Sequence, residues 1–133
     1  MRKIILLLIA IILSAPLYAQ HKPGAHQKPP KIEDVVSNLS ARQKRQLEAI
    51  DEEHRTQLDV VKKELKQVRD SVRYYMDQYG DYSSQVNRLM ERESALQLRV
   101  NKIQYNTKVK IDKVLTPAQY KELKENMKRQ KKK

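Results

Sequence analysis

The sequence predicts an all-α protein, a long antiparallel helical hairpin with a short helix at each end. Two long stretches contain neither proline nor glycine, and their apolar residues recur at steps of three and four, the spacing of one helix face. Gly80 separates the two stretches, and no stretch shows the strict apolar–polar alternation of a β-strand. The chain also lacks Phe, Trp and Cys, so we expect seams between helices, rather than a deep core or disulfides, to hold it together.

Residues 1–19 are expected to be a cleaved signal peptide. Arg2 and Lys3 form a short basic start, Ile4 to Leu13 are unbroken apolar residues, and Ala19 precedes the expected cleavage point. The apolar run is too short for a permanent membrane helix, so we expect export without stable membrane insertion; an uncleaved anchor is the alternative.

The expected mature chain, residues 20–133, keeps 26 basic residues against 16 acidic ones, a net charge of +10. Such a charge usually suggests nucleic acid, but export argues against that partner. Unfolded envelope proteins, lipopolysaccharide and anionic lipid headgroups are the anionic partners that remain. The alternative is that the charge only keeps the protein soluble.

Four segments are expected in the mature chain. Residues 20–31 combine Pro, His and Lys without periodicity, which predicts a disordered leader. Residues 32–129 form the helical domain, beginning with one short helical turn over 32–38. Residues 130–133 are a basic tail, and fraying is expected from Lys128 onward.

The first long helix is expected from Ser40 to Tyr79. Its apolar residues alternate at steps of three and four, the seam of a coiled coil. The seam residues are Leu47, Ile50, Leu58, Val61, Leu65, Val68, Val72, Tyr75 and Tyr79. His54 occupies the one seam position that is not apolar and marks a stutter in the pattern.

Gly80 is expected at the apex, because glycine commonly follows a helix end, and Asp81 or a following serine is expected to cap the next helix. The second long helix should run from about Ser83 to Leu115. Its seam is Val86, Leu89 or Met90, Leu96, Val100, Ile103, Thr107, Ile111 and Val114. A last helix should start at Thr116-Pro117, with Tyr120, Leu123 and Met127 on one face.

A repeated motif, L-[ST]-x-x-Q, precedes two of these helices. Its copies are Leu39-Ser40-x-x-Gln43 and Leu115-Thr116-Pro117-x-Gln119. A hydroxyl three residues before a Gln forms a capping box, and proline suits the first helical position. We therefore interpret the motif as structural capping rather than direct contact with a partner, and we expect the two helix starts to pack together.

The motifs, the signal peptide, the size and the helical content resemble the Spy/CpxP family of periplasmic proteins, whose signature is LTxxQ. The resemblance covers roughly residues 39–129 and includes Leu39, Ser40, Gln43, Leu115, Thr116 and Gln119, with Ser in place of Thr in the first motif. It implies a periplasmic envelope-stress protein that forms a cradle-like homodimer and binds unfolded or stressed envelope proteins as an ATP-independent chaperone. Other members restrain a sensor kinase through its periplasmic domain, or bind zinc in heavy-metal resistance, and both remain alternatives.

Three groups of residues are candidates for client binding or dimerisation. Basic residues on the first long helix would attract anionic or partly unfolded proteins over long range. A stripe opposite the seam of the second helix needs a second subunit or a client to cover it, unless it is scattered surface apolar residues. Tyrosines near the apex suit adaptable contacts, or pack the tip. The candidates are Arg55, Lys62, Lys66, Arg69, Arg73, Tyr74, Tyr79, Leu98, Lys102, Tyr105, Lys108 and Val109.

Neither catalysis nor a cofactor is expected, because the sequence has no cysteine, no glycine-rich loop and no histidine near a plausible nucleophile. His21 and His26 are weak metal candidates, five residues apart in the leader without the spacing of a zinc pair. His54 is interpreted as a packed or pH-sensitive seam residue.

Overall fold

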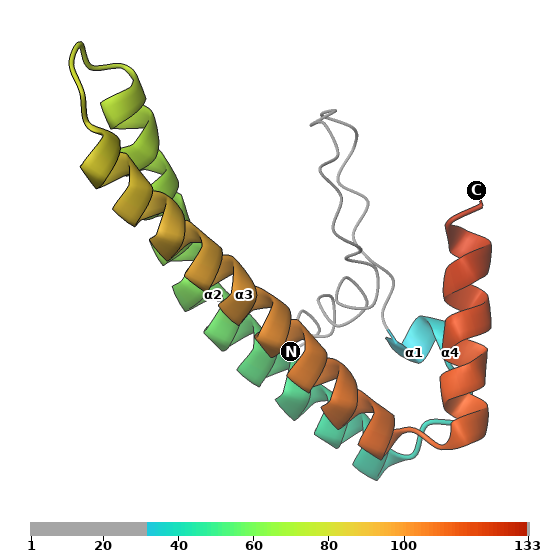
Figure 1. The fold of residues 1–133 in the computed structure, drawn as a ribbon. Helices are drawn as coiled ribbons and strands as arrows, with labels where there is room; N and C mark the ends of the chain where they lie inside the picture. The colour runs from blue at the N-terminus through green and yellow to red at the C-terminus, as the bar shows by residue number, and fades with distance from the viewer. Residues whose placement is uncertain (1–31, 133) are drawn as a thin grey trace.

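The computed structural model describes residues 32–132; the expected signal peptide and the leader with His21 and His26 lie outside the described residues. Over residues 32–132 the secondary structure is helical and contains no strand. The helices are α1 (Ile32–Val35), α2 (Ala41–Met76), α3 (Ser83–Val114) and α4 (Pro117–Gln130). The long helices α2 and α3 run antiparallel, with the short α1 and α4 at one end (Figure 1). The expected all-α hairpin is therefore confirmed, and α4 continues through Lys128 as far as Gln130.

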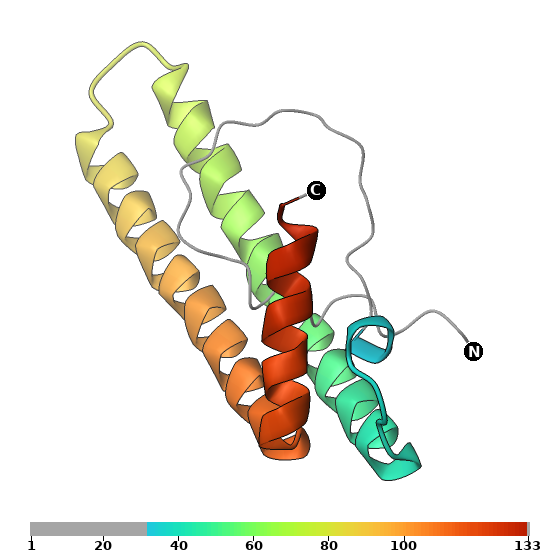
Figure 2. The same cartoon turned by 90° about the vertical axis from the view of Figure 1, so that its right-hand side faces the viewer.

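The molecule has the outline of an open V. One limb is the hairpin of α2 and α3, and the other is α4, which turns back from the end of α3 with α1 packed against it (Figures 1 and 2). We call the junction of the two limbs the base, and residues 66–95, which include the apex, the distal arm. This arrangement leaves the distal arm extended away from α4.

Two apolar clusters follow one another along the hairpin. The base cluster comprises Ile32, Val35, Val36, Leu47, Ile111, Leu115, Leu123 and Met127, with Leu39, Ile50 and Val114 packed at its edge. The arm cluster comprises Leu58, Val61, Leu65, Leu96, Val100 and Ile103, with Val68 at its edge. Both clusters lie on the predicted seams, which confirms the spacing argument for this part of the chain.

A polar layer of Asp51, His54 and Thr107 falls between the two clusters. His54 is only 1 % exposed, and its Nδ1 lies 2.9 Å from the Thr107 hydroxyl oxygen. Because the Thr107 hydroxyl donates its hydrogen to the Ile103 carbonyl oxygen (2.9 Å), it can only accept from His54, so Nδ1 bears the ring proton of the neutral imidazole. The full burial of Asp51 was not predicted, since the seam pattern favoured its half-buried neighbour Ile50.

The distal arm contains no buried residue. α2 ends at Met76, so the prediction that helix and seam continue to Tyr79 is wrong, and that side chain is fully exposed in the connecting loop. The chain reverses here because Gly80 adopts a φ of +136°, which residues with a side chain rarely tolerate. The rings of Tyr75 and Tyr82, 5.2 Å apart, pack together across the turn.

The start of α3 also differs from expectation. Tyr82, rather than Asp81 or a serine, is the N-cap residue and makes no side-chain capping bond. The Asp81 carboxylate instead accepts a hydrogen bond from the backbone N–H of Ser83 at 3.0 Å, which satisfies one free donor of the first turn. Further along α3, Leu89 is half-buried while Met90 is 48 % exposed, so the seam passes through Leu89.

Candidate binding surface

The two copies of the motif form two capping boxes. The Ser40 hydroxyl accepts from the backbone N–H of Gln43 at 3.1 Å, and the Gln43 side chain accepts from the backbone N–H of Ser40 at 2.9 Å. Thr116 and Gln119 repeat both bonds at 3.2 and 2.9 Å, with Pro117 in the first turn. The predicted capping role is confirmed in each copy.

The two boxes are also joined to each other. The side-chain amide of Gln43 donates to Oε1 of Gln119 at 2.8 Å, and that of Gln119 donates to Oε1 of Gln43 at 3.3 Å. Their remaining amide hydrogens reach the carbonyl oxygens of Val114 (2.9 Å) and Asn38 (3.2 Å). Spacing along the chain does not reveal this contact, although the expectation that the two helix starts pack together is confirmed.

Further bonds fasten the segment before α2 to α4. Glu122 accepts from the backbone N–H and the hydroxyl of Ser37 at 3.1 and 3.0 Å, and Asn126 donates to the carbonyl oxygen of Val35 at 2.7 Å. Leu39 and Leu115, which lead the two motifs, both pack in the base cluster. The motif residues therefore build the base and leave the binding surface to other parts of the chain.

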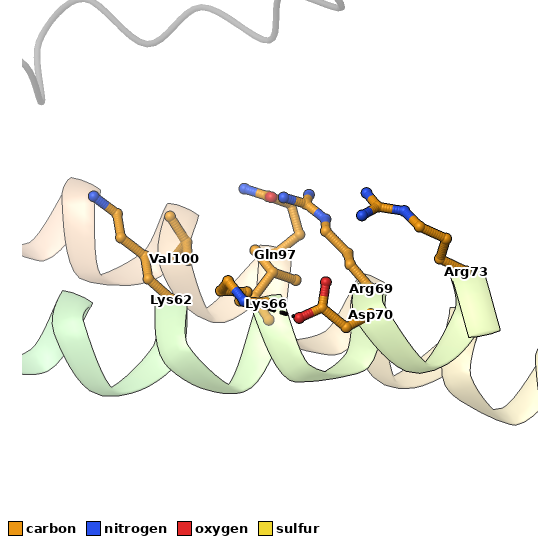
Figure 3. A pocket seen from close by; sticks show the side chains of 8 residues that line it. Lys62, Lys66, Arg69, Asp70, Arg73, Gln97 and Val100 are labelled. Carbon is orange, nitrogen blue, oxygen red and sulfur yellow. Dashed lines mark hydrogen bonds and ion pairs between the residues drawn. The ribbon is translucent and has the colours of Figure 1, made fainter.

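Four of the five basic candidates on α2 line one shallow, open groove of about 590 Å³ between α2 and α3. The lining residues are Lys62, Leu65, Lys66, Arg69, Asp70, Arg73, Gln97 and Val100. Figure 3 shows the Lys62, Arg69 and Arg73 side chains extending to the same side as Val100 and Gln97. We call this surface the basic groove. Arg55 does not line it and pairs with Glu52 instead.

Ion pairs neutralise only part of the charge in the basic groove. Lys66 binds Asp70 at 2.9 Å, and Arg69 binds Glu93 across the hairpin at 2.7 Å. The hydrogen bond from Lys66, aided by the positive charges of Lys66 and Arg73, holds the pKa of Asp70 below its usual value, so this carboxylate stays ionised. Lys66 and Arg69 are thus paired, and the groove keeps a net positive charge from Lys62 and Arg73.

The opposite side of the hairpin has a different charge arrangement. Glu64 lies about 200° around α2 from Lys62, since each residue advances about 100°. There Glu64 pairs with Arg92 of α3 at 2.8 Å, and Glu53 pairs with Lys110 at 2.6 Å. Acidic residues of α2 thus meet basic residues of α3 on that side, which makes the basic groove the side where α2 presents unmatched cations.

The candidate stripe on α3 is open to solvent. Leu98 and Tyr105 are 54 % and 66 % exposed, and Val109 is half-buried. Lys102 is exposed beside the stripe, whereas Lys108 pairs with Asp112, which raises the pKa of Lys108. The expected position of the stripe away from the seam is confirmed; what covers it remains a hypothesis.

The apex tyrosines divide into two kinds. Tyr74 and Tyr79 are exposed. The Tyr75 ring packs edge-on against the Tyr74 ring, with centroids 5.4 Å apart, and at a tilt against the Tyr82 ring, with centroids 5.2 Å apart. The exposed side chains of Met76 and Met90 add apolar surface to the distal arm. Some apex tyrosines therefore pack the tip, and others offer exposed surface for contacts.

The burial of His54 bears on its titration. Removal from water, and secondarily the positive charge of Lys62, lowers the pKa of the His54 imidazole below its usual value. The lowered pKa favours the neutral ring at pH 7, and its Nδ1–H donates to Thr107. Lys62 also lines the basic groove, so its charge acts both on His54 and in the groove.

Within residues 32–132 no group of three or more His, Cys, Asp and Glu side chains is placed to hold a metal ion. In the same range, no helix combines the length and apolar character needed to span a bilayer. No protein-family model, curated protein or solved structure matches the chain.

Proposed function

We propose that this protein is an ATP-independent periplasmic chaperone of the Spy/CpxP type, which binds unfolded or stressed envelope proteins. The observation behind the proposal is the basic groove, which lies on a thin two-helix arm with exposed apolar side chains on its other surfaces. The resemblance to that family rests on the paired L-[ST]-x-x-Q motif, and both copies form capping boxes.

The surface suits a client without a fixed shape. An open groove does not enclose a ligand, so binding there depends on charge and on scattered apolar contacts rather than on a matched outline. The cations of the groove attract acidic segments over long range, and exposed residues such as Tyr74, Leu98 and Tyr105 contact apolar segments. Contacts of this kind are individually weak, so clients bind reversibly.

A homodimer is part of the same proposal. Along the distal arm the seam residues Val72, Tyr75, Val86 and Leu89 are only half-buried, as expected of a ribbon that a second subunit would cover. The stripe of Leu98, Tyr105 and Val109 is the other candidate for that contact. If Tyr105→Glu changes neither dimerisation, measured by sedimentation, nor client protection, the stripe has neither role.

The test measures suppression of client aggregation without ATP, with and without a zinc chelator. Lys62→Gln/Lys66→Gln/Arg73→Gln removes three charges from the groove; Arg42→Gln/Lys44→Gln/Arg45→Gln removes three exposed charges from the start of α2 as a control. We expect the groove variant to bind an acidic unfolded client several-fold more slowly and the control to match the unmodified protein. The loss in the groove variant should shrink in high salt.

Three outcomes would count against the proposal. Equal losses in the two variants would show that total charge, not the groove, attracts clients. Protection that disappears with the chelator would favour the zinc-binding alternative. Binding to one folded sensor domain, without protection of unfolded clients, would favour the regulatory alternative.

A further inference from the structure

The basic residues of α4 are concentrated on one side of the helix. Residues 121–132 contain six basic side chains and two acidic ones. Lys121, Lys124, Lys128 and Lys131 follow one another at steps of three, four and three, so they lie along one face within about 80°. We call these four residues the lysine stripe. Lys124 is half-buried and the other three are exposed.

The other faces of α4 are already used. Leu123 and Met127 are buried in the base cluster. Glu122 binds Ser37. Glu125 lies at the edge of the lysine stripe and is the one acidic residue of α4 that can reduce its charge. The packing of α4 therefore turns Glu122 toward Ser37, just after α1, and leaves Lys121, Lys128 and Lys131 exposed.

A tyrosine links the lysine stripe to α3. The Tyr120 ring lies 5.9 Å from Nζ of Lys124 and 5.5 Å from Nζ of Lys108. The ring attracts both ammonium groups, and this attraction limits the freedom of the Lys108 and Lys124 side chains. The charge of Lys108 is itself compensated by Asp112, so the stripe on α4 supplies the unmatched charge.

We propose that the lysine stripe docks on the surface of an anionic phospholipid bilayer. Clusters of four or more lysines on one helix face are attracted to the phosphates of such a surface. No large apolar side chain of α4 is exposed, so the contact is electrostatic and the helix lies on the headgroups without entering the acyl region. The stripe spans about 15 Å along a straight helix, which suits a flat surface.

A bilayer fits these observations better than a nucleic acid does. The first 19 residues have the composition of a secretory signal, and export across a membrane would separate the chain from nucleic acid. α4 and the distal arm belong to different limbs of the V (Figure 1), so docking through α4 would not use the distal arm. The inference does not depend on the proposed chaperone activity, because it uses a different helix.

The test is co-sedimentation of the full mature chain with vesicles of phosphatidylcholine, alone or mixed with phosphatidylglycerol. Lys121→Gln/Lys124→Gln/Lys128→Gln/Lys131→Gln removes the lysine stripe. Arg42→Gln/Lys44→Gln/Arg45→Gln/Lys63→Gln removes the same charge from exposed positions of α2 outside the basic groove and is the matched control. Circular dichroism and thermal melting verify that both variants fold.

We expect the unmodified protein to bind only the phosphatidylglycerol vesicles, and more weakly as salt increases. The stripe variant should lose at least thirtyfold in affinity, while the α2 control should change less than threefold. An equal loss in the two variants, or equal binding to both kinds of vesicle, would overturn the proposal. Tighter binding to a single-stranded oligonucleotide than to vesicles at the same phosphate concentration would assign the stripe to nucleic acid instead.

Discussion

The base and the distal arm share the same two long helices, yet they are stabilised in different ways. At the base, parts of all four helices enclose fully buried side chains such as Leu123, and the linked glutamines Gln43 and Gln119 tie two helix starts together. Along the distal arm no side chain is buried, and two helices contact each other over a half-exposed seam. The difference teaches that the stability of this fold is concentrated at one end, while its open surface lies at the other.

The strongest test of this comparison replaces one buried leucine of the base and one exposed leucine of α3 just beyond the distal arm. Leu123→Ala removes a side chain that is 0 % exposed in the base cluster, so we expect a loss of about 2–5 kcal/mol in the free energy of unfolding. Leu98→Ala makes the same change at a site that is 54 % exposed, and its effect should stay within about 0.5 kcal/mol. Urea denaturation followed by circular dichroism measures both, and similar losses would contradict the comparison.

A smaller effect is expected from the paired glutamines. Gln119→Ala leaves the partner groups of a buried network unsatisfied, and should cost about 1–3 kcal/mol. Because Gln43 shares that network, the double variant Gln43→Ala/Gln119→Ala should cost less than the two single changes together. Gln97→Ala, an exposed glutamine of α3, serves as the control. Strict additivity would show that the two caps act independently.

The smallest effect concerns acid and the polar layer between the two regions. The native pKa of His54 lies below its usual value of about 6.5, so the unfolded chain takes up a proton first as the pH falls. Stability from this residue is therefore complete above about pH 6.5 and is lost progressively below it. Urea midpoints between pH 7.5 and pH 5 should decline less in His54→Gln than in the unmodified protein.

The two carboxylates with lowered pKa values should not contribute to the change in stability between pH 7.5 and pH 5. Asp70 and Asp81 are stabilised in their ionised form by Lys66 and Ser83, so their contributions disappear only below about pH 4. If the urea midpoints of the unmodified protein and His54→Gln declined equally between pH 7.5 and pH 5, protonation of His54 would not affect stability.

The sequence could predict the hairpin because its two seams and its two capping boxes are local patterns. Periodicity placed Leu58, Val61 and Leu96 correctly, and L-[ST]-x-x-Q placed the starts of α2 and α4. Where the structure depends on contacts between distant residues, the local pattern was insufficient.

Three particular residues show that limit. The seam spacing continued to Tyr79, but α2 ends at Met76, and Tyr75 packs on Tyr82 across the turn. Periodicity alone cannot predict a buried carboxylate at Asp51, because it assigns seams to apolar residues. The four basic residues of the groove were among the candidates on α2, but the groove itself was not predicted. Its opposite wall on α3, Gln97 and Val100, required knowledge of the register between the helices.

The bond between Gln43 and Gln119 also has a consequence for the order in which the chain folds. These residues are 76 positions apart, so their contact forms only after a long loop has closed, whereas Tyr75 and Tyr82 are seven positions apart. Short-range contacts at the apex can therefore form early, although they are the less protected ones in the native state. We expect the region that assembles first to be the arm, and the region that unfolds last to be the base.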